Sequence, residues 1–284
     1  MRLLRTFSAR IGVTLWLAAF VSCRGGAAPP PGPPAWRSLA PGLDYRSHEE
    51  NGTRFHLVRA HLDRIQVRVA DARGQPGRAV ATVDVLAHET KALAALNGTF
   101  FDEGNRPLGL VVSDGRELNP LRDISWWAAL IVRQAGGRPR AEILTTEQLR
   151  KLPREERTRL EAALQVGPRT VVDGRVLKLK NQTAARSAVC ILSDDELILL
   201  ATELKPLESN ALAEFMARPA ERGGLACRQG LMFDGGPSTQ LHLATPSLAL
   251  DVPGGWGVPN ALILQQRPAP AAPASKDSKG SLRD

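Results

Sequence analysis

The 284-residue sequence lacks the residue clusters that usually bind a transition metal. It contains three cysteines and five scattered histidines, and neither a C-x-x-C nor an H-E-x-x-H motif is present. Zinc sites require several cysteine or histidine ligands held close together. The sequence therefore argues against a zinc enzyme.

Two acidic pairs, Asp102-Glu103 and Asp194-Asp195, offer the oxygen ligands that Ca²⁺ prefers. Neither pair belongs to the dense alternating ligand pattern of a calcium-binding loop. Solvated turns are the alternative, and they fit the second pair better. No metal ligand is assigned from the sequence, and Ca²⁺ is the one cofactor left open.

The sequence also lacks the basic stripe of a nucleic-acid-binding protein. Its formal charge is +8, but Arg2, Arg5 and Arg10 lie in an N-terminal segment that we expect to be removed. No run of lysine and arginine interleaved with aromatic residues occurs in the remainder. A nucleic acid is therefore not expected as a partner.

The N-terminus has the pattern of an export signal. The three arginines precede an apolar stretch, residues 11–21, that is too short to span a bilayer comfortably, and Val21-Ser22-Cys23 follows. This segment resembles a bacterial lipoprotein signal, which predicts that Cys23 carries a lipid that anchors the protein to the membrane of the cell envelope. An ordinary secretory signal is the alternative, and the protein would then be periplasmic or secreted. Both interpretations predict export.

Composition divides the chain into four predicted parts. The segment "GGAAPPPGPP" is a proline-rich tether, and the last residues contain too few apolar groups to pack. We expect a signal peptide over 1–22, a lipidated N-terminus and linker over 23–42, one domain over 43–265, and a disordered tail over 266–284. Export permits a disulfide between Cys190 and Cys227, and a pair of buried free thiols is the alternative.

The domain reads as antiparallel strands with a few helices. "RFHLVRAHL" and "IQVRVADA" alternate apolar and polar residues as strands do, and "ALAALN" is a further strand. Three hairpins are expected, in "LGLVVSDGREL", "RTVVDGRVLKL" and "SAVCILSDDELILLAT". "VPNALIL" reads as the last strand.

Helices are expected at about Val83–Ala92 and at Ser209–Ala217, the latter capped by Ser209 or Asn210. The charged stretch Glu147–Leu164 is predicted to be a solvated helical excursion, interrupted near Pro153. No strict alternation of strand and helix occurs. The predicted fold class is therefore α+β, a single mixed domain rich in antiparallel strands with flanking helices.

The stretch "GLMFDGGPSTQLHL" places Asp234 directly after three apolar residues and before two glycines. The apolar run is typical of a buried strand, so the carboxylate lies where the core meets the surface. Asp-Gly and Gly-Pro pairs also mark ordinary turns. Asp234 is therefore either a turn residue or a catalytic acid presented by the strand end.

Two further stretches carry candidate site residues. "ALNGTFFDEGN" ends a strand at Asn97, adds the hydroxyl of Thr99, and pairs Phe100 with Phe101 before Asp102. These residue types suit a carbohydrate site, whereas a tight turn with two core phenylalanines is the alternative. Arg186 precedes a buried strand, and its guanidinium is a candidate to bind a phosphate or carboxylate through two parallel hydrogen bonds. An arginine on the surface without this role is the alternative.

Several blocks occur in an order that resembles the phosphodiester glycosidase family. They are Asn97-Gly98-Thr99-Phe100-Phe101, Pro107-Leu108-Gly109-Leu110, Gly167-Pro168, Ala185-Arg186-Ser187 and Phe233-Asp234-Gly235-Gly236-Pro237-Ser238, and the last strand is similar too. The resemblance covers about residues 43–265. Thr99 stands where a second glycine is common in the family, and Trp126-Trp127 lies in a variable segment, so the sugar is not identified.

The resemblance implies an exported bacterial hydrolase that cleaves the glycosidic bond of a sugar-1-phosphodiester in an envelope or extracellular polysaccharide. Asp234 would stabilise positive charge or activate water, Asp102 or Glu103 would supply a second carboxyl, and Arg186 would hold the phosphate. The other implied contacts to the carbohydrate phosphodiester substrate come from Asn97, Thr99, Phe100, Phe101, Ser238 and an anion nest of the Gly235 and Gly236 amides.

A non-catalytic polysaccharide-binding lipoprotein that uses the same cleft is the main alternative. An aspartic-protease-like site is disfavoured because Asp114 and Asp173 lie in hairpin turns without the following Thr or Ser pattern. A serine hydrolase is disfavoured because Ser238 lacks a G-x-S-x-G elbow.

Overall fold

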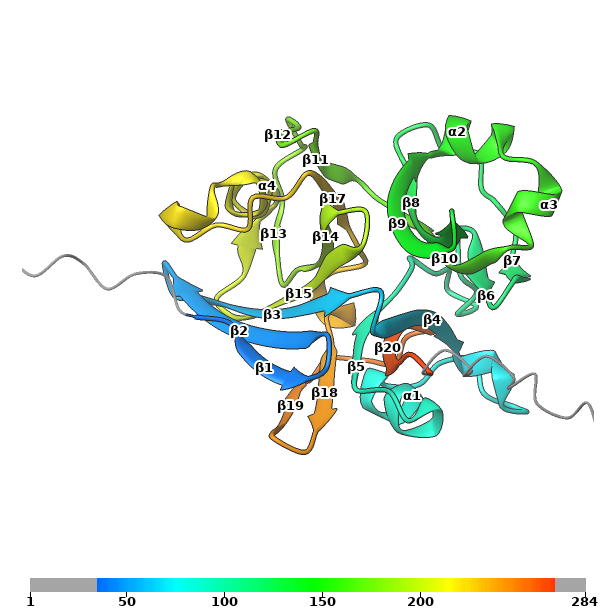
Figure 1. The fold of residues 1–284 in the computed structure, drawn as a ribbon, viewed down its shortest axis with the longest axis horizontal. Coiled ribbons are helices and arrows are strands. Elements are labelled where there is room, and N and C mark those ends of the chain that lie inside the picture. The colour runs from blue at the N-terminus through cyan, green and yellow to red at the C-terminus, as the bar shows by residue number, and fades with distance from the viewer. Residues whose placement is uncertain (1–34, 269–284) are drawn as a thin grey trace, which may run out of the picture. The chain divides into compact units, whose positions relative to one another are not determined.

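The computed structural model of the chain describes residues 35–268 (Figure 1). The predicted signal peptide, the lipidated Cys23, the proline-rich segment and residues 269–284 of the predicted tail lie outside the described residues. Gln266, which the prediction assigned to the disordered tail, ends strand β20 (Asn260–Gln266). Among the helices within 35–268, none has both the length and the apolar character needed to cross a bilayer.

The largest sheet has eight strands, and all its neighbouring strands are antiparallel. In spatial order they are β1 (Arg37–Ala40), β2 (Leu43–Glu50), β3 (Thr53–His61), β15 (Glu196–Leu204), β14 (Ser187–Ser193), β17 (Gln229–Met232), β11 (Arg169–Val172) and β12 (Arg175–Val176). Strand β1 pairs with β2, so the fold begins before the predicted domain boundary at Leu43.

A second, five-stranded sheet contains the predicted last strand. Its order is β19 (Leu248–Val252), β18 (Leu241–Thr245), β5 (Ala94–Asn97), β20 (Asn260–Gln266) and β4 (Ile65–Asp71). Helix α1 (Val83–Thr90) packs against this sheet through Val83, Leu86 and Ala87, the residues whose spacing predicted the helix. A short 3-10 turn, Ala72–Gly74, follows β4.

A third sheet corrects the prediction for residues 147–164. Its order is β7 (Arg116–Asn119), β6 (Val111–Ser113), β10 (Leu160–Val166), β8 (Ala128–Ala135) and β9 (Arg138–Thr145), with helices α2 (Thr146–Lys151) and α3 (Arg154–Arg157) beside it. The chain is helical only as far as Arg157. Strand β10 is central because its apolar residues are buried and it pairs with β6 on one side and β8 on the other.

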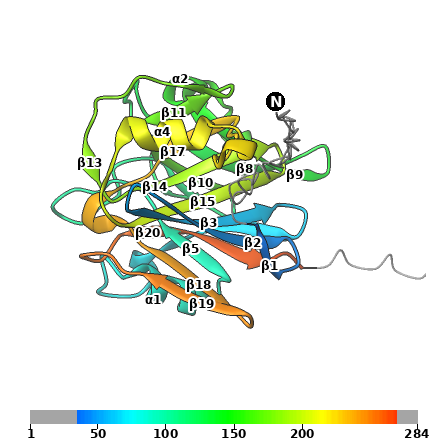
Figure 2. The same ribbon diagram turned by 90° about the vertical axis from the view of Figure 1, so that its left-hand side faces the viewer.

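Helix α4 (Ser209–Ala217) covers the outer face of the large sheet, on the opposite side of the strands from α1 (Figure 2). Leu212, Phe215 and Met216 of the helix pack there against apolar side chains of β3, β11 and β14. The helix has the predicted bounds, but Glu208 occupies the cap position in place of Ser209 or Asn210. The elements not yet named are β13 (Thr183–Ala184), which pairs with β16 (Leu207–Glu208), and the 3-10 turns Ala220–Arg222 and Gly236–Ser238.

The three larger sheets share one apolar core formed by their inner faces. It includes Val58, Leu96, Leu130, Leu199 and Leu262, which are at most 1% exposed. Each of the three hairpins predicted from the sequence is present. The mixed α+β class and its antiparallel character are confirmed.

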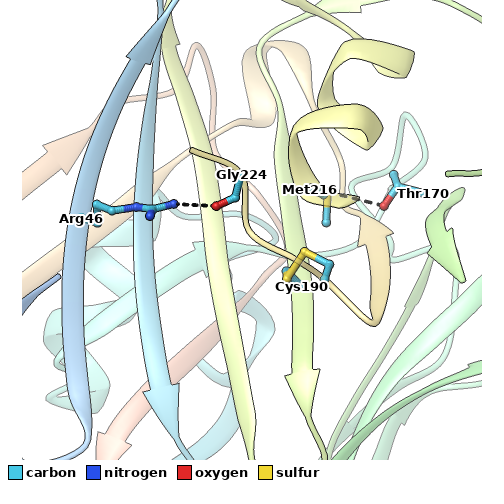
Figure 3. The surroundings of a disulfide bond; sticks show 6 residues. Arg46, Thr170, Cys190, Met216 and Gly224 are labelled. Carbon is cyan, nitrogen blue, oxygen red and sulfur yellow. Dashed lines mark hydrogen bonds between the residues drawn. A yellow bond between two sulfur atoms is a disulfide. The ribbon is translucent and has the colours of Figure 1, made fainter. Parts of the chain in front are cut away.

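A disulfide joins Cys190 of β14 to Cys227, which precedes β17 (Figure 3). It fixes the return segment, residues 218–228 between α4 and β17, to the sheet, and several hydrogen bonds also hold this segment. The amide of Cys227 donates to the carbonyl of Met216 at 2.9 Å, and Arg46 donates to the carbonyl of Gly224 at 3.2 Å. The return segment is therefore anchored by both covalent and polar contacts.

We expect the loss of this disulfide to lower the free energy of unfolding by about 3 kcal/mol. Cys190 and Cys227 are separated by 37 positions, and the cross-link restricts the unfolded chain over that loop. Thermal unfolding of the domain with and without a reductant measures the effect. The Cys190→Ala/Cys227→Ala variant should unfold at the same temperature in both conditions. An equal effect of the reductant on both proteins would contradict the expectation.

Candidate active site

The pairing of two strands brings Asp234 and Arg186 together. Strand β14 runs antiparallel to β17, with Ala188 opposite Met232. Continuing this register by two residues places Arg186 opposite Asp234, and the amide of Phe233 donates to the carbonyl of Ser187 at 2.8 Å. Two residues far apart in the sequence thus meet at one end of the sheet.

Both residues line a cavity of about 700 Å³. The remaining lining residues come from five other segments, from the two residues before Asp234 and from the turn after it. They are Phe100, Trp126, Gly167, Pro168, Lys178, Leu179, Lys180, Gln182, Ala184, Ser209, Met232, Phe233, Gly235 and Gly236. This volume is within the usual range for a small-molecule site.

Asp234 is half-buried, and burial raises the pKa of its carboxyl above the ordinary value. The Ser238 hydroxyl and the Gly235 amide act in the opposite direction, and the amide donates to the carboxylate at 3.0 Å. The net effect favours the protonated form more than water does. Of the described residues that line the cavity, Asp234 alone carries a carboxylate.

Asn97 holds the backbone of Asp234 in place. Its side-chain amide donates to the Asp234 carbonyl at 2.7 Å, and its side-chain oxygen accepts from the Ser187 hydroxyl at 2.6 Å and the Gln240 amide at 3.1 Å. Asn97 is fully buried and is not among the lining residues. Asn97 therefore positions the backbone of Asp234 and does not make the direct contact with substrate that the sequence predicted.

Thr99 is also withdrawn from the cavity. Its hydroxyl accepts from the Asn260 side chain at 2.9 Å, and its backbone amide donates to the same side chain at 3.0 Å. Gly98 makes room for this contact, since a Cβ there would lie 1.9 Å from the Asn260 oxygen. Thr99 therefore helps to fix the strand end and does not reach a ligand in the cavity.

Arg186 is 5% exposed and has no carboxylate partner among residues 35–268. Its guanidinium donates to the carbonyls of Leu207 and Gln182 and to the Ser209 hydroxyl. Among the described residues, the one hydrogen-bond partner of Nη1 is the Met232 sulfur at 3.6 Å, a weak acceptor. Burial lowers the pKa of the guanidinium, which a bound anion would counteract.

The predicted anion nest is not available. The Gly235 amide donates to the Asp234 carboxylate, and the Gly236 amide donates to the Ala185 carbonyl at 2.8 Å. Both glycines line the cavity, and a Cβ on Gly235 would lie 2.8 Å from the same carbonyl. Their contribution is therefore close packing of the turn, because their amides are already paired.

Asp102 does not supply a second carboxyl to the cavity. It is exposed, and its carboxylate accepts from the Arg106 amide at 2.8 Å within its own turn. Glu103 is exposed beside it. Neither residue lines the cavity, because the turn that contains them points these side chains to solvent.

Ser238 is buried, and it affects the cavity only through its hydrogen bond with the Asp234 carboxyl. Its hydroxyl accepts from the indole N–H of Trp256 at 3.1 Å, and it is not a lining residue. It influences the carboxyl by lowering its pKa against the effect of burial. The structure therefore places Ser238 where it tunes Asp234 without contacting the cavity.

Aromatic side chains form a separate part of the cavity wall. Phe100 lines it, as predicted, and packs against Trp127 with 5.4 Å between ring centroids. Phe101 is not a lining residue and instead forms a bridge with Pro107. Trp126 lines the cavity and is 58% exposed, so its ring is accessible to a ligand. The sequence did not predict Trp126 as a site residue.

Lys178 and Lys180 were also missed. They lie between β12 and β13 in a segment without regular structure. The predicted hairpin "RTVVDGRVLKL" included Lys178 as a strand residue, but β12 ends at Val176. The alternation of lysine with leucine in "LKLK" was the one available signal. Within residues 35–268, no group of three or more histidine, cysteine or acidic side chains is arranged to hold a metal ion.

Comparison with solved structures supports the assignment of the domain to an antiparallel α+β fold. The catalytic domain of zebrafish N-acetylglucosamine-1-phosphodiester alpha-N-acetylglucosaminidase is similar, with a TM-score of 0.57 and 19% identity, covering 81% of this chain and 86% of that chain. A hypothetical protein from Synechocystis has a TM-score of 0.53 and 16% identity, covering 79% of this chain and 62% of that chain. At these identities the similarity concerns the fold.

The sequence matches no curated protein, but it matches a family model for phosphodiester glycosidase over residues 90–265. That range contains Asp234, Arg186 and every other lining residue of the cavity. It also covers more than half of the chain. The chain belongs to the phosphodiester glycosidase family.

Proposed function

We propose that the protein is an exported hydrolase that cleaves the glycosidic bond of a sugar-1-phosphodiester in an envelope or extracellular polysaccharide. The observation that carries the proposal is the cavity shared by Asp234 and Arg186, a buried arginine without a carboxylate partner among residues 35–268. A carboxylate beside an anion-binding guanidinium suits a substrate with a reacting sugar carbon next to a phosphate. The name of the zebrafish neighbour describes a phosphodiester glycosidase of this kind.

In this proposal Phe100 and Trp126 contact the faces of the sugar ring, and Asp234 faces the anomeric carbon. As the bond to the phosphodiester oxygen breaks, positive charge develops on the ring and the ionised carboxylate stabilises it. Arg186 donates through Nη1 to the phosphate and stabilises the negative charge of the leaving group.

A single carboxylate is enough for this chemistry. A glycosidase with an alcohol leaving group needs an acid to protonate the departing oxygen. Here the leaving group is the phosphate monoester of the aglycone, which departs as a stable anion, so the missing second carboxyl of Asp102 or Glu103 does not prevent the reaction. Water then adds to the anomeric carbon, and its proton passes to the solvent or to Asp234.

The proposed export agrees with the disulfide between Cys190 and Cys227, because disulfides persist in oxidising compartments outside the cytoplasm. Anchoring through Cys23 stays a proposal that rests on the N-terminal sequence. Mass spectrometry of the protein purified from membranes would detect the lipid on Cys23.

We expect Asp234→Asn to lower kcat by about 10³-fold, because the amide cannot carry the charge that stabilises the transition state. Release of free sugar from a panel of sugar-1-phosphodiesters, including UDP-linked and methyl-phosphate-linked N-acetylglucosamine, measures the loss. Asp102→Asn is the matched control and should keep the wild-type rate. In ¹⁸O-labelled water the label should enter the sugar hydroxyl, as cleavage of the carbon–oxygen bond requires.

Label in the phosphate would contradict the proposed bond cleavage, and a normal rate in Asp234→Asn would contradict the proposed role of that carboxylate. Binding of the phosphodiesters by the wild type without any sugar release would favour the non-catalytic binding protein.

The value of kcat/KM should fall at acidic pH, and this fall should begin at a higher pH than the ordinary pKa of aspartate would give. Burial disfavours the charged form of Asp234, so its pKa is raised from about 3.9 and the active carboxylate is lost at a higher pH than usual. As the pH falls through this pKa, kcat/KM should decrease. A profile that stays flat down to the ordinary pKa of aspartate would contradict the assignment.

Arg186→Lys is expected to lower kcat/KM for phosphodiesters by about 10²-fold. The lysine retains the charge, but it cannot contact the Leu207 carbonyl, the Ser209 hydroxyl and a phosphate in the geometry of a guanidinium. Steady-state kinetics with folded protein, checked by thermal unfolding, measures the effect. Full activity of Arg186→Lys would show that the planar fork is not required.

A further inference from the structure

The cavity contains more cationic groups than the cleavage of one phosphodiester requires. Lys178, Lys180 and Arg186 line it, whereas Asp234 is its one lining carboxylate among the described residues. In the proposed reaction, Asp234 faces the sugar and Arg186 takes the single negative charge of the phosphodiester. The two ammonium groups then remain without an assigned partner.

The segment that carries the lysines is held in a defined position. The side chain of Asn210 in α4 pairs with both backbone groups of Leu179, which lies between the lysines. The Leu179 amide donates to the Asn210 oxygen at 3.0 Å, and the Asn210 amide donates to the Leu179 carbonyl at 3.3 Å. Leu179 is itself partly buried, so the backbone beneath both lysines is fixed.

The same segment is joined to Arg186. The guanidinium of Arg186 donates to the Gln182 carbonyl, and the Ser209 amide donates to that carbonyl at 3.0 Å. Asn181 donates to the carboxylate of Glu208 at 2.7 Å. The lysines therefore belong to the wall that contains Arg186, and the aromatic residues Phe100 and Trp126 come from other segments.

Neither lysine forms an ion pair within residues 35–268, although many other cationic side chains there do. Lys151, for example, pairs with Glu147 at 2.7 Å. Glu208 of β16 accepts a hydrogen bond from Asn181 of the lysine segment and pairs with neither lysine. Two exposed ammonium groups at the edge of one cavity raise its positive potential and attract anionic ligands.

We propose that Lys178 and Lys180 bind a second anionic group of the substrate, carried by the part of the molecule beyond the scissile phosphodiester. This inference rests on the proposed function and deepens it by naming a substrate class. The preferred substrates are sugar phosphodiesters whose aglycone carries a further phosphate or carboxylate. Such a group occurs at regular spacing in an anionic polymer.

The test uses two synthetic substrates that differ only in one phosphate monoester on the aglycone, and a third in which a carboxylate replaces that phosphate. The wild type should have a KM about tenfold lower for the doubly anionic substrates. Lys178→Gln/Lys180→Gln should lose this preference, so that its kcat/KM falls more for the doubly anionic substrates than for the singly anionic one. Lys151→Gln, which removes a lysine from α2, is the matched control and should keep the preference.

Added salt should reduce the preference of the wild type, because the lysine contacts are exposed to screening. An unchanged preference in Lys178→Gln/Lys180→Gln, or no preference in the wild type, would overturn the proposal. A preference for the phosphate but not for the carboxylate would identify the second group as a phosphate.

Failure of the proposed function is recognised separately. If the wild type releases no sugar from any substrate, the hydrolase proposal fails, and calorimetric binding of the same three compounds still tests the lysine site. Asp234→Asn should bind the doubly anionic compounds more tightly than the singly anionic one. The same protein with Lys178→Gln/Lys180→Gln added should not, and equal binding of all compounds by both proteins would overturn the inference.

Discussion

The geometry of the cavity depends on the hydrogen bonds of one buried amide side chain. Asn97 accepts from β14 and from the segment before β18, and it donates to the carbonyl of Asp234. Leaving any of these groups unpaired in the core would cost about 1–3 kcal/mol. The amide thus fixes the end of β5 against the strand that presents the carboxylate. Asp234 can be precisely oriented because its backbone, and not only its side chain, is held.

The second constraint is the burial of Arg186 among neutral acceptors. Two carbonyls and a hydroxyl hold the guanidinium in place without neutralising it. A carboxylate hydrogen-bonded to the guanidinium would have neutralised the charge that a phosphate can use. Asp234 lies opposite in the strand register, yet burial keeps its own pKa raised, so the site combines a fixed cation with a carboxylate of reduced acidity. This pairing is the electrostatic basis of the proposed chemistry.

Local sequence signals predicted the local structure well. Asp114-Gly115 and Asp173-Gly174 adopt positive φ and close the expected hairpins, and α1 buries the residues whose spacing defined it. The failure at Leu160–Val166 has a physical reason. Charged residues before this segment suggested a solvated helix, but its burial depends on strands β6 and β8, which pair with it from both sides. Such pairing is not visible in a window of sequence.

The sequence by itself determined the strand that leads to Asp234, the order of motifs that resembles the family, and the residue types present near the site. The tertiary structure decided which of those residues reach the cavity. Asn97 ends β5, Thr99 follows it, and Ser238 lies in the 3-10 turn after Asp234, yet all three are buried and hydrogen-bond to other protein groups. Trp126 and Lys178 enter the site from irregular segments. Sequence specifies which groups are available, but the direction of a side chain follows from the packing of distant segments against one another.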